Sequence, residues 1–256
     1  GTHFRVEYKN NVNAGTATVT VIGLENYDGT ETAVNYTITK RDFTVTPNSG
    51  GKVYGTDDPT SLAYKYTGNV NNEIPGFSGS LSREVGEDVG SYAINLGTFK
   101  LASTSTFNVN NYNLVFSSEV VYFTITPKNI AEIAVTMNPS TVPFDGLAKE
   151  PDAVMVYNGN TLAKDRDFEI IYENNTNAGQ ATAKITGKGN FTGTTEGKFT
   201  ISQTALAISA SGYSNQYDGK SHGITLSGTG LEGATVWYGS AEGVYETTTA
   251  PTYKDA

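Results

Sequence analysis

One stretch of this chain occurs twice, and that duplication constrains the fold more than any other feature. Residues 4–29 can be placed over residues 168–193 without a gap. Both copies contain the motif Tyr-x-Asn-Asn-x-Asn-Ala-Gly, at Tyr8–Gly15 and at Tyr172–Gly179. Repetition of this length is typical of arrays in which each module packs mainly against its neighbours. The chain is therefore expected to fold as a series of small modules.

Recurring segments also predict where these modules begin and end. Val121–Pro127 repeats the closing strand pattern of the duplicated stretch. An aromatic residue beside Gly or Asp-Gly recurs at Tyr54, Phe144 and Tyr217, which predicts a buried ring beside a tight turn at each module start. The predicted division is a closing half module at 1–40, full modules at 41–127 and 128–202, and an opening half module at 203–256. We expect each half module to leave a hydrophobic face and a strand edge uncovered, and to be marginally stable or paired with another chain.

The local pattern between these marks is that of β-strands. Phe4, Val6 and Tyr8 alternate with polar residues, as a strand with one buried face requires. The Asn-Ala-Gly motif predicts a bend between two paired strands, and Asn158-Gly159 predicts a two-residue hairpin turn. No amphipathic helix of three turns is evident. The predicted fold class is all-β, with tandem small antiparallel β-sandwich (Ig-like) modules in an elongated arrangement, or β-grasp-like modules if one crossover contains a helix.

Composition and charge exclude several classes of function. The formal net charge is −9, which opposes binding to nucleic acid or to anionic lipid. No apolar run approaches the roughly 20 residues that a membrane span needs, and the first residues do not form a signal peptide. The sequence contains no cysteine, which excludes disulfides and cysteine-ligated metals. We therefore expect no nucleic-acid partner and no membrane insertion.

Three groups of residues resemble known families of bacterial repeats. Residues 172–194 resemble repeats that are common in large bacterial surface proteins and adhesins. The segments that resemble an MBG domain of the YGX type are Val53–Pro59, Gly79–Arg83, Gly86–Ile94 and Phe123–Thr126. Tyr217–Lys220 with Gly233–Gly239 is similar to the opening of related bacterial Ig-like repeats. These resemblances imply a secreted or wall-attached protein with spacer or adhesive modules, and they imply no reaction.

The residues that could support catalysis do not form a recognisable pattern. His3 and His222 fall in different modules, and neither has a neighbouring carboxylate-histidine pattern, so we predict structural or surface roles. Gly76–Gly79 has the wrong spacing for a nucleophile elbow and is expected to be a loop. Gly219-Lys220-Ser221 lacks the preceding glycine of a phosphate-binding loop, because position 214 is Ser. The chain is predicted to have no catalytic site, no metal and no cofactor.

Three further groups have both a functional and a structural interpretation. Three acidic clusters could offer oxygen ligands to calcium: Asp57-Asp58, Glu84 with Glu87-Asp88, and Asp165-Arg166-Asp167. The favoured interpretation is that these residues occupy solvated turns. Asn35, Asn174 and Asn190 begin glycosylation triplets of the kind that arise by chance in Asn- and Thr-rich chains. Five aromatic residues near the end of the sequence could stack on sugars: Tyr213, Tyr217, Trp237, Tyr238 and Tyr245. The favoured interpretation is that they pack in a core.

Repetition without a singular chemical site favours a structural stalk that presents distal domains of a bacterial surface protein. The alternative is an adhesin segment that binds a host glycan or extracellular protein directly, through a strand edge or an aromatic patch. Its ligand-binding residues are unknown. In both cases the expected location is extracellular, at the bacterial surface or cell wall, with the neighbouring repeat modules of the parent protein as further partners.

Overall fold

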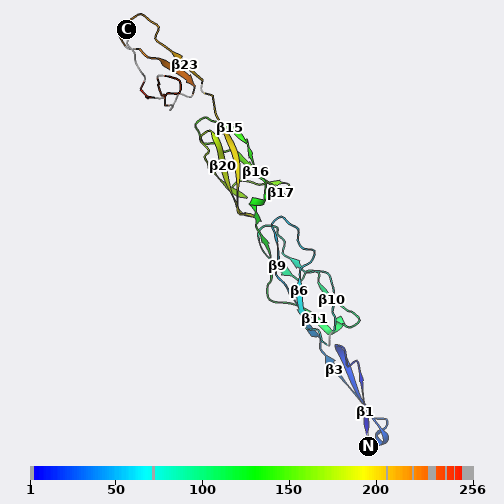
Figure 1. Ribbon diagram of the computed structural model, residues 1–256. Helices are drawn as coiled ribbons and strands as arrows, with labels where there is room; N and C mark the ends of the chain where they lie inside the picture. The colour runs from blue at the N-terminus through cyan, green and yellow to red at the C-terminus, as the bar shows by residue number, and fades with distance from the viewer. Residues whose placement is uncertain are drawn as a thin grey trace. The chain divides into compact units, whose positions relative to one another are not determined.

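The computed structural model describes residues 3–70, 73–205, 207–220, 222–229, 235–239, 241–244 and 246–249. The strand prediction is confirmed, because strands dominate these residues (Figure 1). The helices in this described part are three short 3-10 turns, namely η1 Glu25–Tyr27, η2 Val109–Asn111 and η3 Ile130–Glu132. No crossover there contains a longer helix, so the sandwich is the better supported of the two predicted architectures.

The chain divides into two compact units. The first consists of Gly1–Val135, Val154–Ile171 and Lys184–Glu196, and the second of Thr136–Ala153, Tyr172–Ala183 and Gly197–Ala256. This division follows spatial contacts and not the sequence repeats. The module boundaries at 40/41, 127/128 and 202/203 therefore stay predictions.

The first repeat copy forms a three-stranded antiparallel sheet with the order β1-β2-β3 (Figure 1). Its strands are β1 Phe4–Lys9, β2 Gly15–Gly23 and β3 Glu31–Ile38. The Asn13–Gly15 motif connects β1 to β2, as predicted, since Lys9 pairs with Thr18 across the bend. Ala17 is fully buried, but Phe4 is 60% exposed. One apolar face of this sheet is therefore largely open to solvent.

The segment 41–127, called the central module from here on, forms two main sheets around one core. Their strand orders are β11-β4-β6 and β5-β12-β9-β8, and β7 and β10 form a separate pair. The strands are β4 Arg41–Pro47, β5 Gly50–Val53, β6 Tyr64–Thr67, β7 Gly76–Ser78, β8 Ser82–Arg83, β9 Gly90–Asn95, β10 Lys100–Ala102, β11 Tyr112–Phe116 and β12 Tyr122–Thr126. Most pairs are antiparallel, but β11 runs parallel to β4 and β12 runs parallel to β5. The sheets are therefore mixed.

The core of the central module is rich in aromatic rings. Phe43 and Phe123 are fully buried, and each lies on a strand whose neighbouring residues point outward. The Phe43 ring meets the Phe107 ring edge to face at 5.8 Å, and Phe107 stacks on Tyr112 at 4.6 Å. Burying rings of this size supplies most of the stability of a small β module.

The expectation of a loop at Gly76–Gly79 is wrong for its first three residues, which form β7. Phe77 pairs with Leu101 of β10, and its ring lies 5.3 Å from Phe99 at the core. The turn begins only at Gly79, which has a φ of +69°. The glycines suggested a loop, but the packing of Phe77 decides the local structure.

Residues 128–202 contain the remaining well-packed strands. These are β13 Lys128–Asn129, β14 Thr136–Asn138, β15 Thr141–Pro143, β16 Asp152–Val154, β17 Val156–Tyr157, β18 Asn160–Thr161, β19 Phe168–Glu173, β20 Gly179–Gly187, β21 Phe191–Thr192 and β22 Thr194–Ser202. The largest sheet has the order β15-β22-β20-β19. The predicted hairpin is confirmed, since β17 pairs with β18 around Asn158 and Gly159, which both have positive φ.

The two repeat copies share their backbone conformation as well as their sequence. The bend has φ +56° at Asn10 and +136° at Gly15, and the second copy has +56° at Asn174 and +138° at Gly179. Burial differs, because Phe168 is only 3% exposed while the equivalent Phe4 is exposed. The second copy follows the strands β14 to β18.

The last described segment contains one strand pair. β23 Ala207–Ser211 runs antiparallel to β24 Thr225–Thr229. Every residue of β23 is exposed. No core residue is found in the described part of this segment.

Candidate functional site in the first unit

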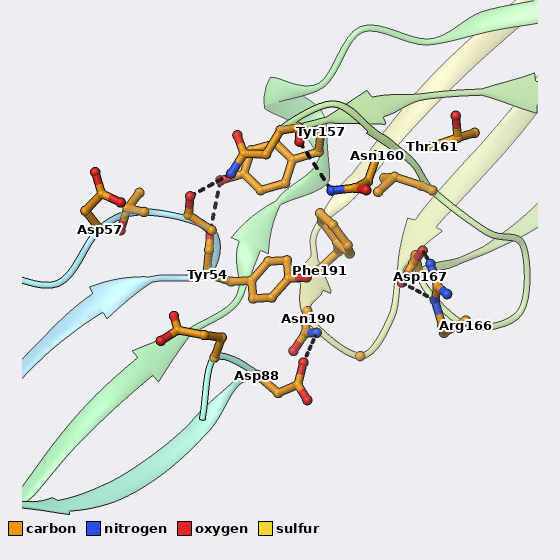
Figure 2. A pocket seen from close by; sticks show the side chains of 16 residues that line it. Tyr54, Asp57, Asp88, Tyr157, Asn160, Thr161, Arg166, Asp167, Asn190 and Phe191 are labelled. Carbon is orange, nitrogen blue, oxygen red and sulfur yellow. Dashed lines mark hydrogen bonds and ion pairs between the residues drawn. The ribbon is translucent and has the colours of Figure 1, made fainter. Parts of the chain in front are cut away.

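A pocket of ≈ 850 Å³ lies within the first unit. Figure 2 shows that its walls come from three parts of the chain: residues 54–57 and 87–88 of the central module, the stretch 157–167, and residues 189–191. These segments are far apart in sequence. The pocket therefore depends on contacts between segments that are distant in sequence.

Three aromatic rings form one side of the pocket and pack against each other. Tyr54 meets Phe191 edge to face at 5.5 Å, and Tyr157 meets Phe191 in the same way at 5.8 Å. The ammonium of Lys128 lies 5.8 Å from the centre of the Tyr157 ring. Since the rings face one another and a cation, they form a small apolar contact and do not present a flat, open stacking surface.

The backbone of the Tyr54-Gly55 turn accepts hydrogen bonds from two side chains. The Tyr157 hydroxyl donates to the Tyr54 carbonyl at 2.8 Å, and the Asn158 amide donates to the Gly55 carbonyl at 2.6 Å (Figure 2). Gly55 has a φ of +78°, and a Cβ at this position would lie 2.5 Å from a ring carbon of Tyr157. Only glycine satisfies both the backbone conformation and the close approach.

The predicted turn at each module start is confirmed, because Gly55, Gly146 and Gly219 all have positive φ. The predicted buried ring is not found. Tyr54 is half-buried, but Phe144 is 37% exposed and Tyr217 is 77% exposed. The ring is covered only where another segment packs on it.

Asn190 makes the most complete polar contact of the site. Its side-chain oxygen accepts from the Val89 backbone amide at 2.8 Å, and its side-chain nitrogen donates to Asp88 at 2.7 Å. Its own carbonyl accepts from the Lys128 amide at 3.0 Å. Asn190 begins one of the glycosylation triplets. These contacts give its side-chain amide a structural role, because both its oxygen and its nitrogen are hydrogen-bonded.

The far wall contains an ion pair that also closes a turn. Asp167 is buried and accepts from Arg166 at 2.7 Å and from the Ala163 backbone amide at 2.8 Å. The Arg166 guanidinium and the backbone amide lower the pKa of the Asp167 carboxyl. Asp165 and Asp167 were candidates for a calcium site, but the Asp167 carboxylate is occupied by protein donors.

A four-residue charge cluster lies beside the pocket and consists of Lys52, Asp58, Arg83 and Glu87. Arg83 contacts Asp58 through two nitrogens, at 2.7 and 2.9 Å, and Glu87 at 2.6 Å. Lys52 bonds Asp58 at 2.7 Å and also pairs with Glu87. The Arg83 side chain is only 8% exposed and lies 5.2 Å from the ring centres of Tyr92 and Phe123. The cluster therefore connects strands β5 and β8 to the core.

These contacts set the protonation states of the cluster. The hydrogen bonds from Arg83 lower the pKa of Asp58 to about 2, against the effect of burial. Bonds from Lys52 and Arg83 also lower the pKa of Glu87. Burial alone would lower the pKa of Lys52, but its bonds to Asp58 and Glu87 outweigh this and raise it. All four groups are charged at neutral pH.

Several of the acidic residues that could have bound calcium have partners within the protein. Asp58 and Glu87 are neutralised by the two cations, and Asp88 is bonded to Asn190. Among the residues that the structure describes, no group of three or more His, Cys, Asp or Glu side chains is placed to hold a metal ion.

A second contact between segments lies where the first repeat copy meets the central module. The Ala14 backbone amide donates to the side-chain oxygen of Asn111 at 2.8 Å. The side-chain oxygen of Asn13 accepts from Asn111 at 3.0 Å and from Asn108 at 3.3 Å. We call this arrangement the asparagine clasp. It joins the bend of the first copy to the η2 turn.

The structure gives His222 a carboxylate neighbour. His222 lies 2.9 Å from Asp218, and its ring stacks on Tyr213. The predicted surface role of His3 is consistent with its position, since it lies 4.0 Å from Glu25 with both side chains exposed. Asp218 also accepts from the Lys220 amide at 2.9 Å, so Gly219-Lys220 belongs to a tight turn. Ser221 lies outside the described residues.

The five aromatic residues of the last segment do not form a packed core in the described part. Tyr217 and Trp237 are largely exposed, and Tyr213 is 40% exposed. Tyr238 is half-buried and exchanges backbone hydrogen bonds with Thr247. Tyr245 lies outside the described residues. The favoured core interpretation is therefore not supported for Tyr213, Tyr217 and Trp237.

Comparison with protein families identifies the module that supplies one wall of the pocket. Residues 43–121 match the model of the MBG domain (YGX type). The match supports an MBG-containing chain, and this family is a non-enzymatic, repeat-type domain family. The Tyr54-Gly55 turn lies inside the matched residues. A search of curated proteins found no match.

In the described residues no buried side-chain nitrogen or oxygen lacks a hydrogen-bond partner. None of the described helices has the length and apolarity of a membrane span. The sequence pattern indicates the Tyr54-Gly55 turn, but it does not indicate the contacts of Asn13, Lys52 and Arg83. A search for cations near the acidic pairs could have found the last two.

Proposed function

We propose that this chain is a non-catalytic stalk segment of a bacterial surface protein, in which successive modules hold distal domains away from the cell. The observation that carries the proposal is the type of contact between the central module and the two repeat copies. In both contacts a backbone amide donates a hydrogen bond to an asparagine side-chain oxygen, and the second contact adds three packed rings.

Contacts of this type restrict the hinge between neighbouring modules. A backbone group held by a side chain of the next module fixes orientation as well as distance, because hydrogen bonds weaken steeply away from linear geometry. A spacer needs this restriction, whereas freely jointed modules would collapse toward a random coil. The bacterial surface and an extracellular location belong to the same proposal.

Small-angle X-ray scattering of the full chain tests the stalk. A compact globule of this length has a radius of gyration near 18 Å, whereas the four predicted units in a row, two full and two half modules, would reach roughly 140 Å and a radius of gyration of about 40 Å. Asn190→Ala and Asn13→Ala together should broaden the distribution of distances by loosening both contacts. A compact profile for the unaltered chain would exclude the stalk.

A second candidate function is direct adhesion to a host glycan or extracellular protein. It is favoured by the exposed aromatic residues of the last segment, since Tyr217 is 77% and Trp237 is 54% exposed. Exposed aromatic rings suit the apolar faces of sugars and the anchors of protein interfaces.

Binding of the full chain to arrays of host glycans and matrix proteins tests adhesion. Trp237→Ala and Tyr217→Ala should each weaken any saturable binding at least tenfold. Tyr122→Ala, which removes an exposed ring of the central module, is the control and should have no effect. Absence of binding by the unaltered chain would leave the stalk as the better supported function.

A further inference from the structure

The sheet of the first repeat copy has an open strand edge and an open apolar face. Its strand order is β1-β2-β3, and in the described part of the chain no strand pairs with the outer edge of β3. On its apolar face Tyr8 is 61% exposed and Tyr36 is 38% exposed. An apolar face beside an unpaired edge is the arrangement to which a further strand can add.

The second repeat copy shows which element occupies the equivalent edge. β15 Thr141–Pro143 runs parallel to residues 200–202 of β22, the strand that corresponds to β3. The Phe144 amide donates to the Ser202 carbonyl at 3.0 Å, and the Thr200 amide donates to the Ser140 carbonyl at 2.9 Å. The corresponding edge of the first copy is formed by residues 37–39.

The segment that contains β15, residues 136–154, is called the opening segment from here on, and it also reaches the apolar face. The hydroxyl of Tyr172, the equivalent of Tyr8, donates to the Pro151 carbonyl at 2.7 Å. Phe199, the equivalent of Tyr36, is only 2% exposed. The face that is open in the first copy is therefore buried in the second, where the opening segment contacts it.

The last described segment of the chain has the same strands as the opening segment. Placing Tyr217 over Phe144 aligns β14 with residues 209–211 of β23, and β16 with residues 225–227 of β24. Each of the two pairs forms a two-stranded sheet. The alignment rests on the Phe-Asp-Gly and Tyr-Asp-Gly motifs, and the strands follow from it without a gap.

The turn between these strands is also the same in both segments. Asp145 and Asp218 each accept a hydrogen bond at 2.9 Å from the backbone amide two residues later. A basic side chain four residues later contacts each carboxylate, namely Lys149 and His222. The last segment is therefore a second opening segment in its conformation as well as in its motif.

What this second opening segment lacks is the sheet that it would complete. Residues 214–216 occupy the positions of β15, but they are exposed and pair with no strand among the described residues. Ala210 lies opposite Leu226 where the first opening segment has Met137 and Ala153, so a large and a small side chain are exchanged and the combined volume is similar.

We infer that this protein binds a second molecule of itself end to end, with residues 207–220 and 222–229 of one molecule completing the β1-β2-β3 sheet of the other. Residues 214–216 then form a strand parallel to residues 37–39. The Ile224 carbonyl, at the position of Pro151, accepts from the Tyr8 hydroxyl. Because the two surfaces are different, the contact is heterologous and further molecules can add at both ends.

This inference goes beyond the proposed function, because both a stalk and an adhesin could associate in this way. It concerns a contact between molecules, whereas the stalk concerns the shape of one molecule. Scattering from a dilute monomer that excludes the stalk would therefore leave the inference intact.

Sedimentation equilibrium of the full chain tests the inference. At concentrations up to roughly 1 mM, which reveal dissociation constants into the millimolar range, the average mass should rise above one chain mass. It should continue to rise past two chain masses, since head-to-tail contacts do not close at a dimer.

Two proline variants show whether residues 214–216 form the added strand. The hydrogen bonds of β15 to β22 flank Val142 at a spacing of two residues, so Val142 faces β22 and Pro143 faces away. Asn215→Pro, at the position of Val142, should weaken association about tenfold or more, because proline cannot donate. Gln216→Pro, at the position of Pro143, is the matched control and should change association by less than about twofold.

A second pair of variants tests the apolar face. Tyr36→Lys places a charge on the face that must be covered, and should also weaken association about tenfold or more. Ala33→Lys is its control, because Ala33 is exposed on the opposite face of the same strand. The altered side chains of all four variants are largely in solvent in the single molecule, so its fold should be retained.

Mixing the two weakened variants gives the decisive measurement. Asn215→Pro keeps an intact face, and Tyr36→Lys keeps an intact opening segment. Each alone should remain at one chain mass, while the equimolar mixture should form a dimer of two chain masses and stop there.

Three results would overturn the inference. The first is a mass of one chain at every concentration. The second is association that stops at two chain masses and is unchanged by Asn215→Pro, which would mean that the apolar faces pack against each other. The third is a mixture of the two weakened variants that stays monomeric while the unaltered chain associates.

Discussion

Removing the Asp58 carboxylate should weaken the central module by an amount that the charge cluster allows us to estimate. Asp58→Asn keeps the shape of the side chain but removes its charge. Arg83 then loses the partner that contacts two of its nitrogens and retains Glu87 and the carbonyls of Glu84 and Gly86. Because these partners remain, the guanidinium does not become an unpaired buried charge, and the penalty stays moderate.

The magnitude follows from the pKa of the Asp58 carboxyl. The folded value is about 2 and the ordinary value is 3.8. The difference, 3.8 minus 2, corresponds to about 2.4 kcal/mol at roughly 1.36 kcal/mol for each pH unit. The Asp58 side chain is 41% exposed, so solvent screening reduces the expected loss to about 1 kcal/mol.

The same difference fixes the direction of the pH dependence. The folded pKa lies below the unfolded one, so the carboxylate contributes stability above pH 3.8 and loses that contribution as the pH falls toward about 2. Asp58→Asn should therefore be less stable than the unaltered chain at pH 7 and nearly equal to it at pH 2.

Amide exchange of strand β12 measures this effect, because β12 lies at the centre of a sheet of the same module. Asp57→Asn is the matched control, since it removes an adjacent charge that has no part in the four-residue cluster. The argument fails if Asp58→Asn and Asp57→Asn have the same opening free energy at pH 7. It also fails if the Asp58 variant loses as much stability on acidification as the unaltered chain.

Three further substitutions probe the packing and the contact site. Gly55→Ala should weaken the contact between the Tyr54-Gly55 turn and Tyr157 by roughly 1–3 kcal/mol, because alanine disfavours the positive φ and its Cβ would overlap the Tyr157 ring. NMR chemical shifts of residues at this contact should report its opening. Phe123→Ala should destabilise the central module by about 3–5 kcal/mol in urea unfolding, whereas Tyr122→Ala on the outer face should cost less than about 1 kcal/mol. Asn190→Ala should speed amide exchange at the contact by removing two hydrogen bonds, worth about 1–2 kcal/mol together, whereas Asn26→Ala should have no effect.

Much of the fold could be predicted because strand periodicity is a local property. The alternation of Phe123 and Ile125 with polar residues indicated β12. The Asn158-Gly159 pair indicated the hairpin of β17 and β18. The parallel pairs β4 with β11 and β5 with β12 could not be predicted in this way. They join strands that are distant in sequence, and a single strand carries no signal for its partner or direction.

The site was predictable only where a turn required a particular residue. Tyr54-Gly55 stood out because glycine beside an aromatic residue marks a turn, and the structure adds the contact with Tyr157. Asn190 offered only a glycosylation triplet, because its structural role depends on Val89, which is remote in sequence. Asp58 was a candidate metal ligand until its bonds to Lys52 and Arg83 were located.

The two repeat copies separate what local sequence determines from what neighbours determine. Their backbones agree at every bend, down to the positive φ shared by Glu25 and Gly189, although only one of these residues is glycine. Their burial does not agree, since Phe4 is 60% exposed and Phe168 only 3%. A repeat of this type has a backbone set by its own residues, whereas its stability comes largely from adjacent structure. Exchanging the two copies should therefore preserve their folds and change their stabilities, each copy acquiring the stability of the position it occupies.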